Sequence, residues 1–178
     1  VGVTGENGTT NIYGGTVNVK NDAVFNQSTL NNQGIFNFNG TTGQVTNLAD
    51  AETAKGTTNI YTGSFTVKHT TIQDKITVAK DAILTLGDDD GYSEINEISN
   101  DGTLNLYDAD IKQIIGTGTT TIYSMATMDA GITQDNLIID GNFNTYLVVS
   151  ADGLNIKNGI IKDDKTRKKF IYNGVIFK

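Results

Sequence analysis

Cysteine, proline and tryptophan are all absent from this sequence of 178 residues, which contains a single histidine. Without cysteine the chain has neither a disulfide framework nor a thiolate metal site, and redox chemistry does not identify its compartment. No stretch of the sequence carries apolar residues at helical spacing over several turns. With 20 glycines and abundant threonine and asparagine, the composition instead predicts an almost purely β structure with many turns.

Basic residues are scarce over most of the chain and gather at its end. Counted from the sequence, residues 1–155 hold 18 acidic and 6 basic side chains, whereas residues 156–178 hold 2 acidic and 7 basic ones. An acidic body argues against nucleic acid as a partner, because neutralising phosphates requires a basic face. No apolar run approaches about 18 residues. No charged-then-apolar leader is present either, so we expect no membrane insertion of this segment and a targeting segment that was removed or not included.

The sequence repeats itself on two scales. Residues 8–40 align without a gap onto residues 56–88, and both copies open with the hexad Gly-Thr-Thr-Asn-Ile-Tyr, at residues 8–13 and 56–61. A looser third hexad, Gly-Thr-Thr-Thr-Ile-Tyr, occupies residues 118–123. Self-similarity of this kind is typical of a repeat architecture, in which each unit buries its apolar face only against its neighbours.

The shorter repeat is a strand pattern: a small residue, a variable one, an apolar one, Asn or Thr, and another apolar one. Its alternation places Phe36 and Phe38 on one face of a strand and the residue between them on the other. Segments such as 31–34 and 100–102, rich in Asn and Gly, suit tight turns because these residues tolerate positive φ. The strand pattern recurs at residues 15–19, 34–38, 63–67, 82–86 and 102–106.

Short strands and turns in this order predict one domain with an all-β fold, a parallel β-helix or β-solenoid. A sandwich would not require near-duplicate segments, and successive motifs start 16 to 26 residues apart, near the length of one solenoid turn. Stacked coils place like residues above one another about 4.8 Å apart and form internal apolar ladders. We expect roughly seven or eight coils. Residues 1–156 form the repeat region and residues 157–178 a basic C-terminal cap of the same domain.

The motifs at residues 31–38 and 100–106, together with the hexads, resemble those of a known group of proteins. Residues 7–156 are similar to the passenger regions of bacterial autotransporter adhesins and related right-handed parallel β-helices. The resemblance implies an extracellular stalk or adhesive surface carried by the cell envelope, without a catalytic centre.

The C-terminal end departs from the repeat. Asn-Gly at residues 173–174 lies between two apolar runs, which predicts a β-hairpin with a type I′ turn. A solenoid leaves unpaired strand edges at its ends, and such edges polymerise unless they are covered or charged. We favour a hairpin cap, and the alternative is a surface for head-to-tail assembly on the acidic body of another copy. The residues of this cap or assembly surface are Lys165, Arg167, Lys168, Lys169, Phe170, Tyr172 and Phe177.

The hexad tyrosines Tyr13, Tyr61 and Tyr123 are candidates for a stacking row that binds sugars or a protein partner, since tyrosine offers an apolar face with a polar tip. We favour the alternative in which they seal the corners of the coils. The single histidine, His69, aligns with Asn21 of the first copy. We therefore interpret His69 as a polar turn residue and not as a catalytic base.

Acidic residues give the remaining candidate sites. Residues 88–90 with Glu94 offer oxygen atoms for a cation such as calcium, but their spacing is not that of a known calcium loop, and an acidic turn is the favoured interpretation. Parallel β-helices include polysaccharide lyases and hydrolases. A catalytic pair of carboxylates on adjacent coils is therefore an alternative interpretation of the acidic residues. The acids considered are Asp74, Asp81, Asp108, Asp110, Asp135 and Asp140.

The sequence thus favours a non-catalytic, extracellular structural or adhesive β-solenoid of a bacterial cell surface, with no cofactor and no metal. Its expected partners are other copies of itself, or a protein or glycan of a host or cell surface. One alternative function is a subunit of a head-to-tail surface filament. A second is a glycan-binding or polysaccharide-degrading β-helix.

Overall fold

The computed structural model describes residues 3–20, 23–49, 56–87, 93–139, 146–149 and 154–161. These residues contain strands and turns but no helix, and every pairing between the strands is parallel. The strands are β1 Val3–Ile12, β2 Thr16–Val19, β3 Val24–Asn32, β4 Ile35–Phe38, β5 Thr42–Ala49, β6 Thr57–Ile60, β7 Gly63–Val78, β8 Ala82–Leu86, β9 Ser93–Asn100, β10 Thr103–Ile115, β11 Thr119–Ile139, β12 Tyr146–Val149 and β13 Leu154–Ile161.

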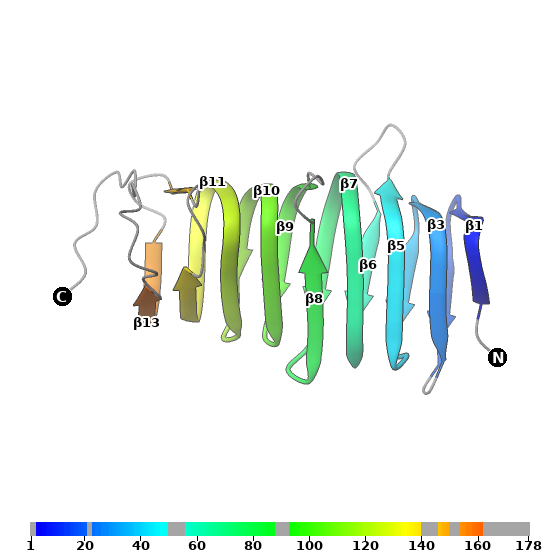
Figure 1. Ribbon diagram of the computed structural model, residues 1–178, viewed down its shortest axis with the longest axis horizontal. Helices are drawn as coiled ribbons and strands as arrows, with labels where there is room; N and C mark the ends of the chain where they lie inside the picture. The colour runs from blue at the N-terminus through cyan, green and yellow to red at the C-terminus, as the bar shows by residue number, and fades with distance from the viewer. Residues whose placement is uncertain are drawn as a thin grey trace.

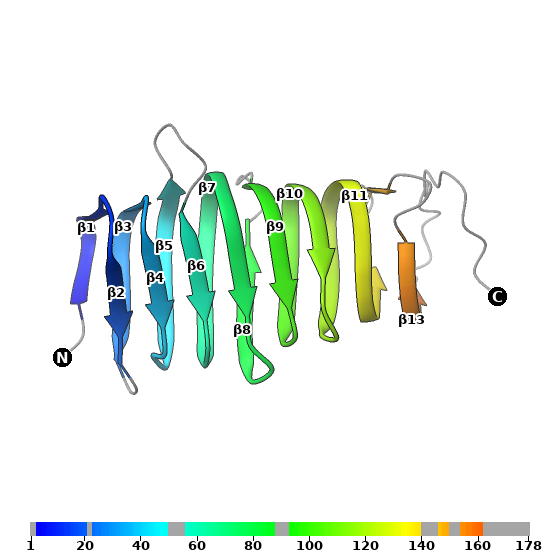
Figure 2. The same ribbon diagram turned by 180° about the vertical axis from the view of Figure 1, so that it is seen from behind.

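The strands wind into a solenoid whose turns advance along the long axis from β1 at one end to β13 at the other (Figures 1 and 2). Parallel pairing joins each turn to the next in three stacks of strand segments, which we call ladders 1, 2 and 3. Ladder 1 contains residues 3–5, 24–27, 42–45, 63–67, 82–86, 103–106 and 119–122. Ladder 2 contains residues 9–12, 29–32, 47–49, 69–71, 93–95, 109–111, 125–128 and 146–149. Ladder 3 contains residues 16–19, 35–38, 57–60, 75–78, 97–100, 113–115, 131–134 and 154–156.

The predicted all-β solenoid is therefore confirmed. Along ladder 1 the chain returns to the same side six times, from Val3 to Thr120, so these segments make about six turns. At about 4.8 Å per turn, they extend over roughly 30 Å. Strand β13 continues the parallel pairing to Ile161, five residues beyond the boundary that we placed at residue 156.

Alternate residues of the three ladders fill the interior, as the strand pattern predicts. Phe36 and Phe38 of ladder 3 are fully buried. Their rings join Phe25 and Phe65 in a cluster with ring centroids 5.0 to 6.4 Å apart. Gly43 lies between Phe25 and Phe65 in ladder 1, and a Cβ there would lie 2.1 Å from the Phe65 ring. The missing side chain at this position thus makes room for the neighbouring ring.

The long sequence copies do not stack on each other in phase. The hexad at residues 8–13 lies along ladder 2, its copy at 56–61 along ladder 3, and the third hexad at 118–123 along ladder 1. The internal apolar ladders are thus formed between successive turns, and not between equivalent residues of the long copies. All three sides of a turn share the same alternation of buried and exposed residues, so a given segment fits any of them.

The hexads instead share a polar contact inside the solenoid. In each one, the second threonine hydroxyl donates to the side-chain oxygen of a glutamine that lies 14 to 17 residues later. These pairs are Thr10 and Gln27, Thr58 and Gln73, and Thr120 and Gln134, at 3.2, 3.4 and 3.1 Å. The same local chemistry therefore occurs on three different sides of the solenoid.

A buried asparagine from the preceding turn completes the second and third of these clusters. Asn100 donates through Nδ2 to the backbone oxygen of Thr119 at 3.1 Å and to Gln134 Oε1 at 2.7 Å, and its Oδ1 accepts from the Gly102 N–H at 3.1 Å. In the second cluster, Asn32 donates through Nδ2 to the backbone oxygen of Thr57 at 3.0 Å and to Thr58 Oγ1 at 3.1 Å, and its Oδ1 accepts from the Gly34 N–H at 3.1 Å. These asparagines were predicted as turn residues, yet both are fully buried and hold two turns together.

Two residues after each of these asparagines lies a glycine, and it is required by the close approach of the preceding turn and not by a positive φ. Positive φ occurs at five described glycines, and neither Gly34 nor Gly102 is among them. A Cβ on Gly34 would lie 2.7 Å from the backbone oxygen of Gly15, and one on Gly102 would lie 2.2 Å from that of Ala79. At these corners successive turns are so close that no side chain fits between them.

Candidate functional site

The outer surface of ladder 1 is the most uniform face of the described chain. Figure 1 views the solenoid from this side, with β3, β5 and β8 in front. Its first outward row contains Val24, Thr42, Ser64, Ile83, Thr103 and Thr119. Its second row contains Asn26, Gln44, Thr66, Thr85, Asn105 and Thr121. None of these side chains is charged, and all except Thr121 are half-buried or exposed. We call these two rows the neutral face.

Charged residues border the neutral face without entering it. Lys20, Lys80, Asp81 and Asp101 are exposed in the turns that lead into ladder 1. Lys68 directly follows the ladder 1 segment of β7 and is half-buried. In a sequence with 19% charged residues, the described outer positions of one complete side are thus filled by hydroxyl, amide and aliphatic groups.

The tyrosines of the hexads lie at three different corners and do not form one row. Tyr13 follows ladder 2 and is 80% exposed, and Tyr61 lies in the turn into ladder 1 and is 42% exposed. Tyr123 follows ladder 1 and is half-buried. Its ring stacks on Tyr107 of the preceding turn, with centroids 5.0 Å apart and planes at 16°. Two of the three predicted tyrosines therefore border the neutral face, on opposite sides of it.

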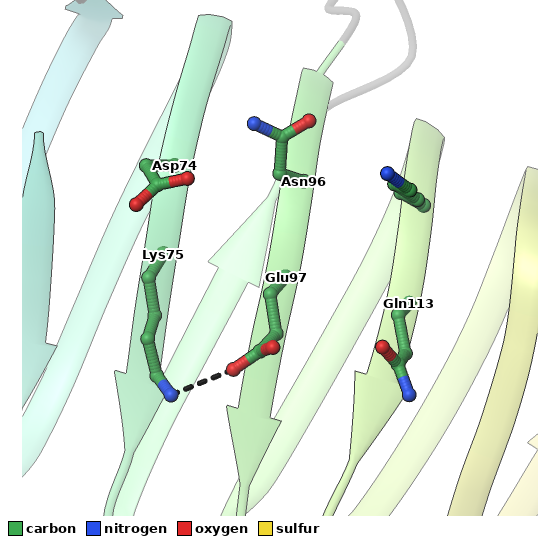
Figure 3. Close-up of a pocket in the computed structure, with 6 residues that line it drawn as sticks. Asp74, Lys75, Asn96, Glu97 and Gln113 are labelled. Carbon is green, nitrogen blue, oxygen red and sulfur yellow. Dashed lines mark ion pairs between the residues drawn. The ribbon is translucent and has the colours of Figure 1, made fainter. Parts of the chain in front are cut away.

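On ladder 3, charged side chains line a hollow of about 370 Å³. Figure 3 shows its side chains on three neighbouring strands, β7, β9 and β10. Lys75 Nζ and Glu97 Oε1 form an ion pair at 2.6 Å across adjacent turns. Both side chains are a third or more exposed, so the pair contributes at most about 1 kcal/mol. The hollow is lined by Asp74, Lys75, Asn96, Glu97, Lys112 and Gln113.

His69 lies within β7, where its Cα partner is Asn47 of the preceding turn. It is half-buried in ladder 2, so the prediction of a turn residue is wrong, because the strand continues through this corner without a break. Of the six candidate acids, those with described positions are Asp81, which lies in a turn, and Asp74, Asp108, Asp110 and Asp135, which lie within strands.

The structure places Glu94 directly beside Asp110 on the next turn, and Asp74 lies apart from both, in the hollow on ladder 3. In the described part of the chain, no three His, Cys, Asp or Glu side chains gather as metal ligands would.

The same part contains no helix able to cross a membrane. Residues 88–90 and Asp140 lie outside the described residues.

Asp108 gives a prediction about pH. Its Oδ1 is buried without a hydrogen-bond partner among the described residues, and burial raises its pKa above the ordinary value of 3.8. The folded state then binds this proton more tightly than the unfolded state, so Asp108 lowers stability as the pH rises from about 4 through its raised pKa. Asp108→Asn is therefore expected to be more stable than the parent chain at pH 7, and the difference should shrink towards pH 3.8.

Urea unfolding of both chains at pH 3.8, 5 and 7 measures this difference. Asp81→Asn serves as the control, because Asp81 is exposed in a turn and its replacement should leave stability unchanged at each pH. A parent chain that is the more stable of the two at pH 7 would show that the carboxylate of Asp108 has a stabilising partner.

All seven residues of the predicted cap or assembly surface lie outside the described residues, as does the predicted hairpin turn. Sequence reasoning missed the neutral face and the pairing of Tyr107 with Tyr123. The signal for the face is present in the strand pattern, whose outward positions carry no charge in any ladder 1 segment from β3 to β11. This signal can be recognised only after the strand segments of ladder 1 have been distinguished from those of ladders 2 and 3.

Comparison of the chain with protein-family models gives no match, and no similar curated protein or similar solved structure is found.

Proposed function

We propose that this chain is a non-catalytic, extracellular β-solenoid of a bacterial cell surface that acts as a structural and adhesive element, similar to the passenger region of an autotransporter adhesin. The observation that carries the proposal is the neutral face, which follows one side of the rod over six successive strand segments. The face is uncharged and is held by a continuous core, so it presents many small polar contacts to one extended target. Contact through this surface, and not chemistry, is the proposed mechanism.

Adhesion of coated beads tests the proposal. Beads carrying the chain are expected to attach to bacterial or host cells about tenfold more than beads carrying the double variant Thr66→Lys/Thr85→Lys, which places two charges on the neutral face. The control Thr57→Lys/Gln113→Lys adds the same charge to the outer positions of ladder 3 and should keep attachment. Attachment of the parent beads no stronger than that of bare beads would contradict an adhesive function.

A filament subunit is the second candidate, and the first turn favours it. On β2, Val17 occupies an inward position, since it pairs with the fully buried Phe36, yet it is 37% exposed. The hexad of the first turn has its glutamine contact, with Thr10 bonded to Gln27, but no asparagine from a preceding turn among the described residues. A further coil stacked on this edge would cover Val17 and supply that asparagine.

Light scattering and negative-stain electron microscopy test end-to-end assembly. The chain is expected to form rods that lengthen with concentration, and Val17→Lys should shorten them because the charge lies at the stacking edge. Tyr13→Lys, an exposed position at the neighbouring corner, is the control. Single short rods at every concentration and salt level would exclude the filament.

A further inference from the structure

We propose that the neutral face binds an uncharged polysaccharide, with Tyr61 at one edge and the Tyr107–Tyr123 pair at the other as aromatic borders. This inference rests on the proposed adhesive function and names the chemical class of its target. It concerns only side chains that the structure describes on ladder 1 and at its two corners.

The chemistry of the face matches that of a neutral sugar polymer. The outward rows contain hydroxyl groups of threonine and serine and amides of Asn26, Gln44 and Asn105, which both donate and accept hydrogen bonds. Sugar hydroxyls have the same dual capacity. A polyanion would require basic groups and a polycation acidic ones, and the two rows contain neither, so the electrostatic match is with an uncharged polymer.

The geometry of the face suits an extended chain. Outward positions repeat at about 4.8 Å along the solenoid axis, and most of them carry a hydroxyl or amide group, so polar contacts recur along the face. Threonine side chains are stiff at χ1, and Asn105 donates to Thr85 at 3.3 Å, which fixes two of these groups across adjacent turns. Little side-chain freedom is therefore lost on binding, and this preorganisation favours affinity.

Apolar groups provide the remaining surface that a pyranose ring requires. Val24 and Ile83 of the first row are 36% and 40% exposed, and they interrupt a row of hydroxyl groups. Tyr61 is 42% exposed in the turn that leads into β7. On the opposite corner, Tyr107 and Tyr123 form a stacked pair. Aromatic side chains with one apolar face and a polar tip suit ligands that combine C–H faces with hydroxyl groups.

Affinity electrophoresis and pull-down with defined polysaccharides test the inference. The neutral probes are cellulose, mannan and starch, and the charged probes are alginate and chitosan. The chain is expected to bind at least one neutral probe, and neither charged probe more tightly than that one. Thr66→Lys/Thr85→Lys should weaken this binding about tenfold or more, while Thr57→Lys/Gln113→Lys on ladder 3 should leave it unchanged.

Two tyrosine variants distinguish a contact at the edge of the neutral face from a general effect of losing an exposed aromatic side chain. Tyr61→Ala is expected to weaken binding about five- to tenfold, whereas Tyr13→Ala should have no effect, because Tyr13 lies at the corner between ladders 2 and 3. Both side chains are exposed, so both variants should fold. Unchanged urea midpoints would verify this for every variant used.

Binding to none of the neutral probes would overturn the inference, as would stronger binding to alginate or chitosan, or equal losses for Tyr61→Ala and Tyr13→Ala. The bead assay keeps this result separate from the proposed function. Beads that adhere to cells, lose adhesion after protease treatment of those cells, and bind no neutral probe would indicate a protein target, which overturns the inference and retains the adhesive function. Failure of adhesion itself would contradict the proposed function.

Discussion

Asn100→Ala is expected to lower the free energy of unfolding by about 3 kcal/mol, because it leaves several buried polar groups without partners. The Asn100 side chain is fully buried, and it bonds to the backbone oxygen of Thr119, to Gln134 Oε1 and to the Gly102 N–H. Gln134 in turn donates to the backbone oxygen of residue 100 at 3.1 Å. Each buried group that loses its partner costs about 1 to 3 kcal/mol, and water cannot easily replace the amide in a packed interior.

The matched control is an asparagine on the outside of the solenoid. Asn37 Nδ2 donates to Asn18 Oδ1 at 2.7 Å, and Asn37 Oδ1 accepts from Asn59 at 2.9 Å. These bonds are accessible to water, so Asn37→Ala should lower stability by less than about 1 kcal/mol. Urea unfolding of both variants against the parent measures the difference. Similar losses at Asn37 and Asn100 would show that burial of the cluster does not govern its contribution.

Gly56→Ala is the second substitution with a large expected effect. A Cβ at this buried position would lie 2.0 Å from the backbone oxygen of Asn32 and 3.0 Å from its carbonyl carbon. Both atoms belong to the backbone of the preceding turn, so relief requires two turns to move apart at this corner. We expect a loss of about 3 kcal/mol, at the upper end of the usual range for over-packing.

Gly14→Ala is the control for this effect. No atom lies within 4 Å of a Cβ built at Gly14, and its φ is not among the positive values. The substitution should therefore be neutral or stabilise the chain by up to about 1 kcal/mol, because alanine restricts the unfolded state more than glycine does. Thermal unfolding of both variants compares them directly. A Gly56→Ala chain as stable as the Gly14→Ala chain would show that the corner adapts to a methyl group.

Part of the candidate surface was accessible from the sequence and part was not. Tyr61 and Tyr123 were named as candidates from their place in the hexads, and both border the neutral face. The pairing of Tyr123 with Tyr107, and not with another hexad tyrosine, was not accessible in this way. Stacking follows spatial neighbours one turn apart, and the hexads are more than one turn apart along the chain.

The amino-acid sequence by itself determined the class of the fold. Apolar residues at every second position, as at Phe36 and Phe38, dictate strands with one buried face. Repetition without proline or helical spacing then favours a parallel solenoid over other β folds. These signals are local, because each strand obeys the same alternation whatever its neighbours are, and for this reason the sequence was sufficient to predict them.

Only the tertiary structure decided which segments share a side. Turns between 16 and 22 residues long, read from successive members of ladder 1, place the three hexads on three different ladders and so bring Asn32 and Asn100 inside. The same turn lengths place the uncharged outward residues together on ladder 1, and they place Lys75 and Glu97 on ladder 3. The physical reason is that register between turns depends on the length of every corner and on the close contacts of glycines such as Gly56 and Gly102, which are pairwise properties of distant residues.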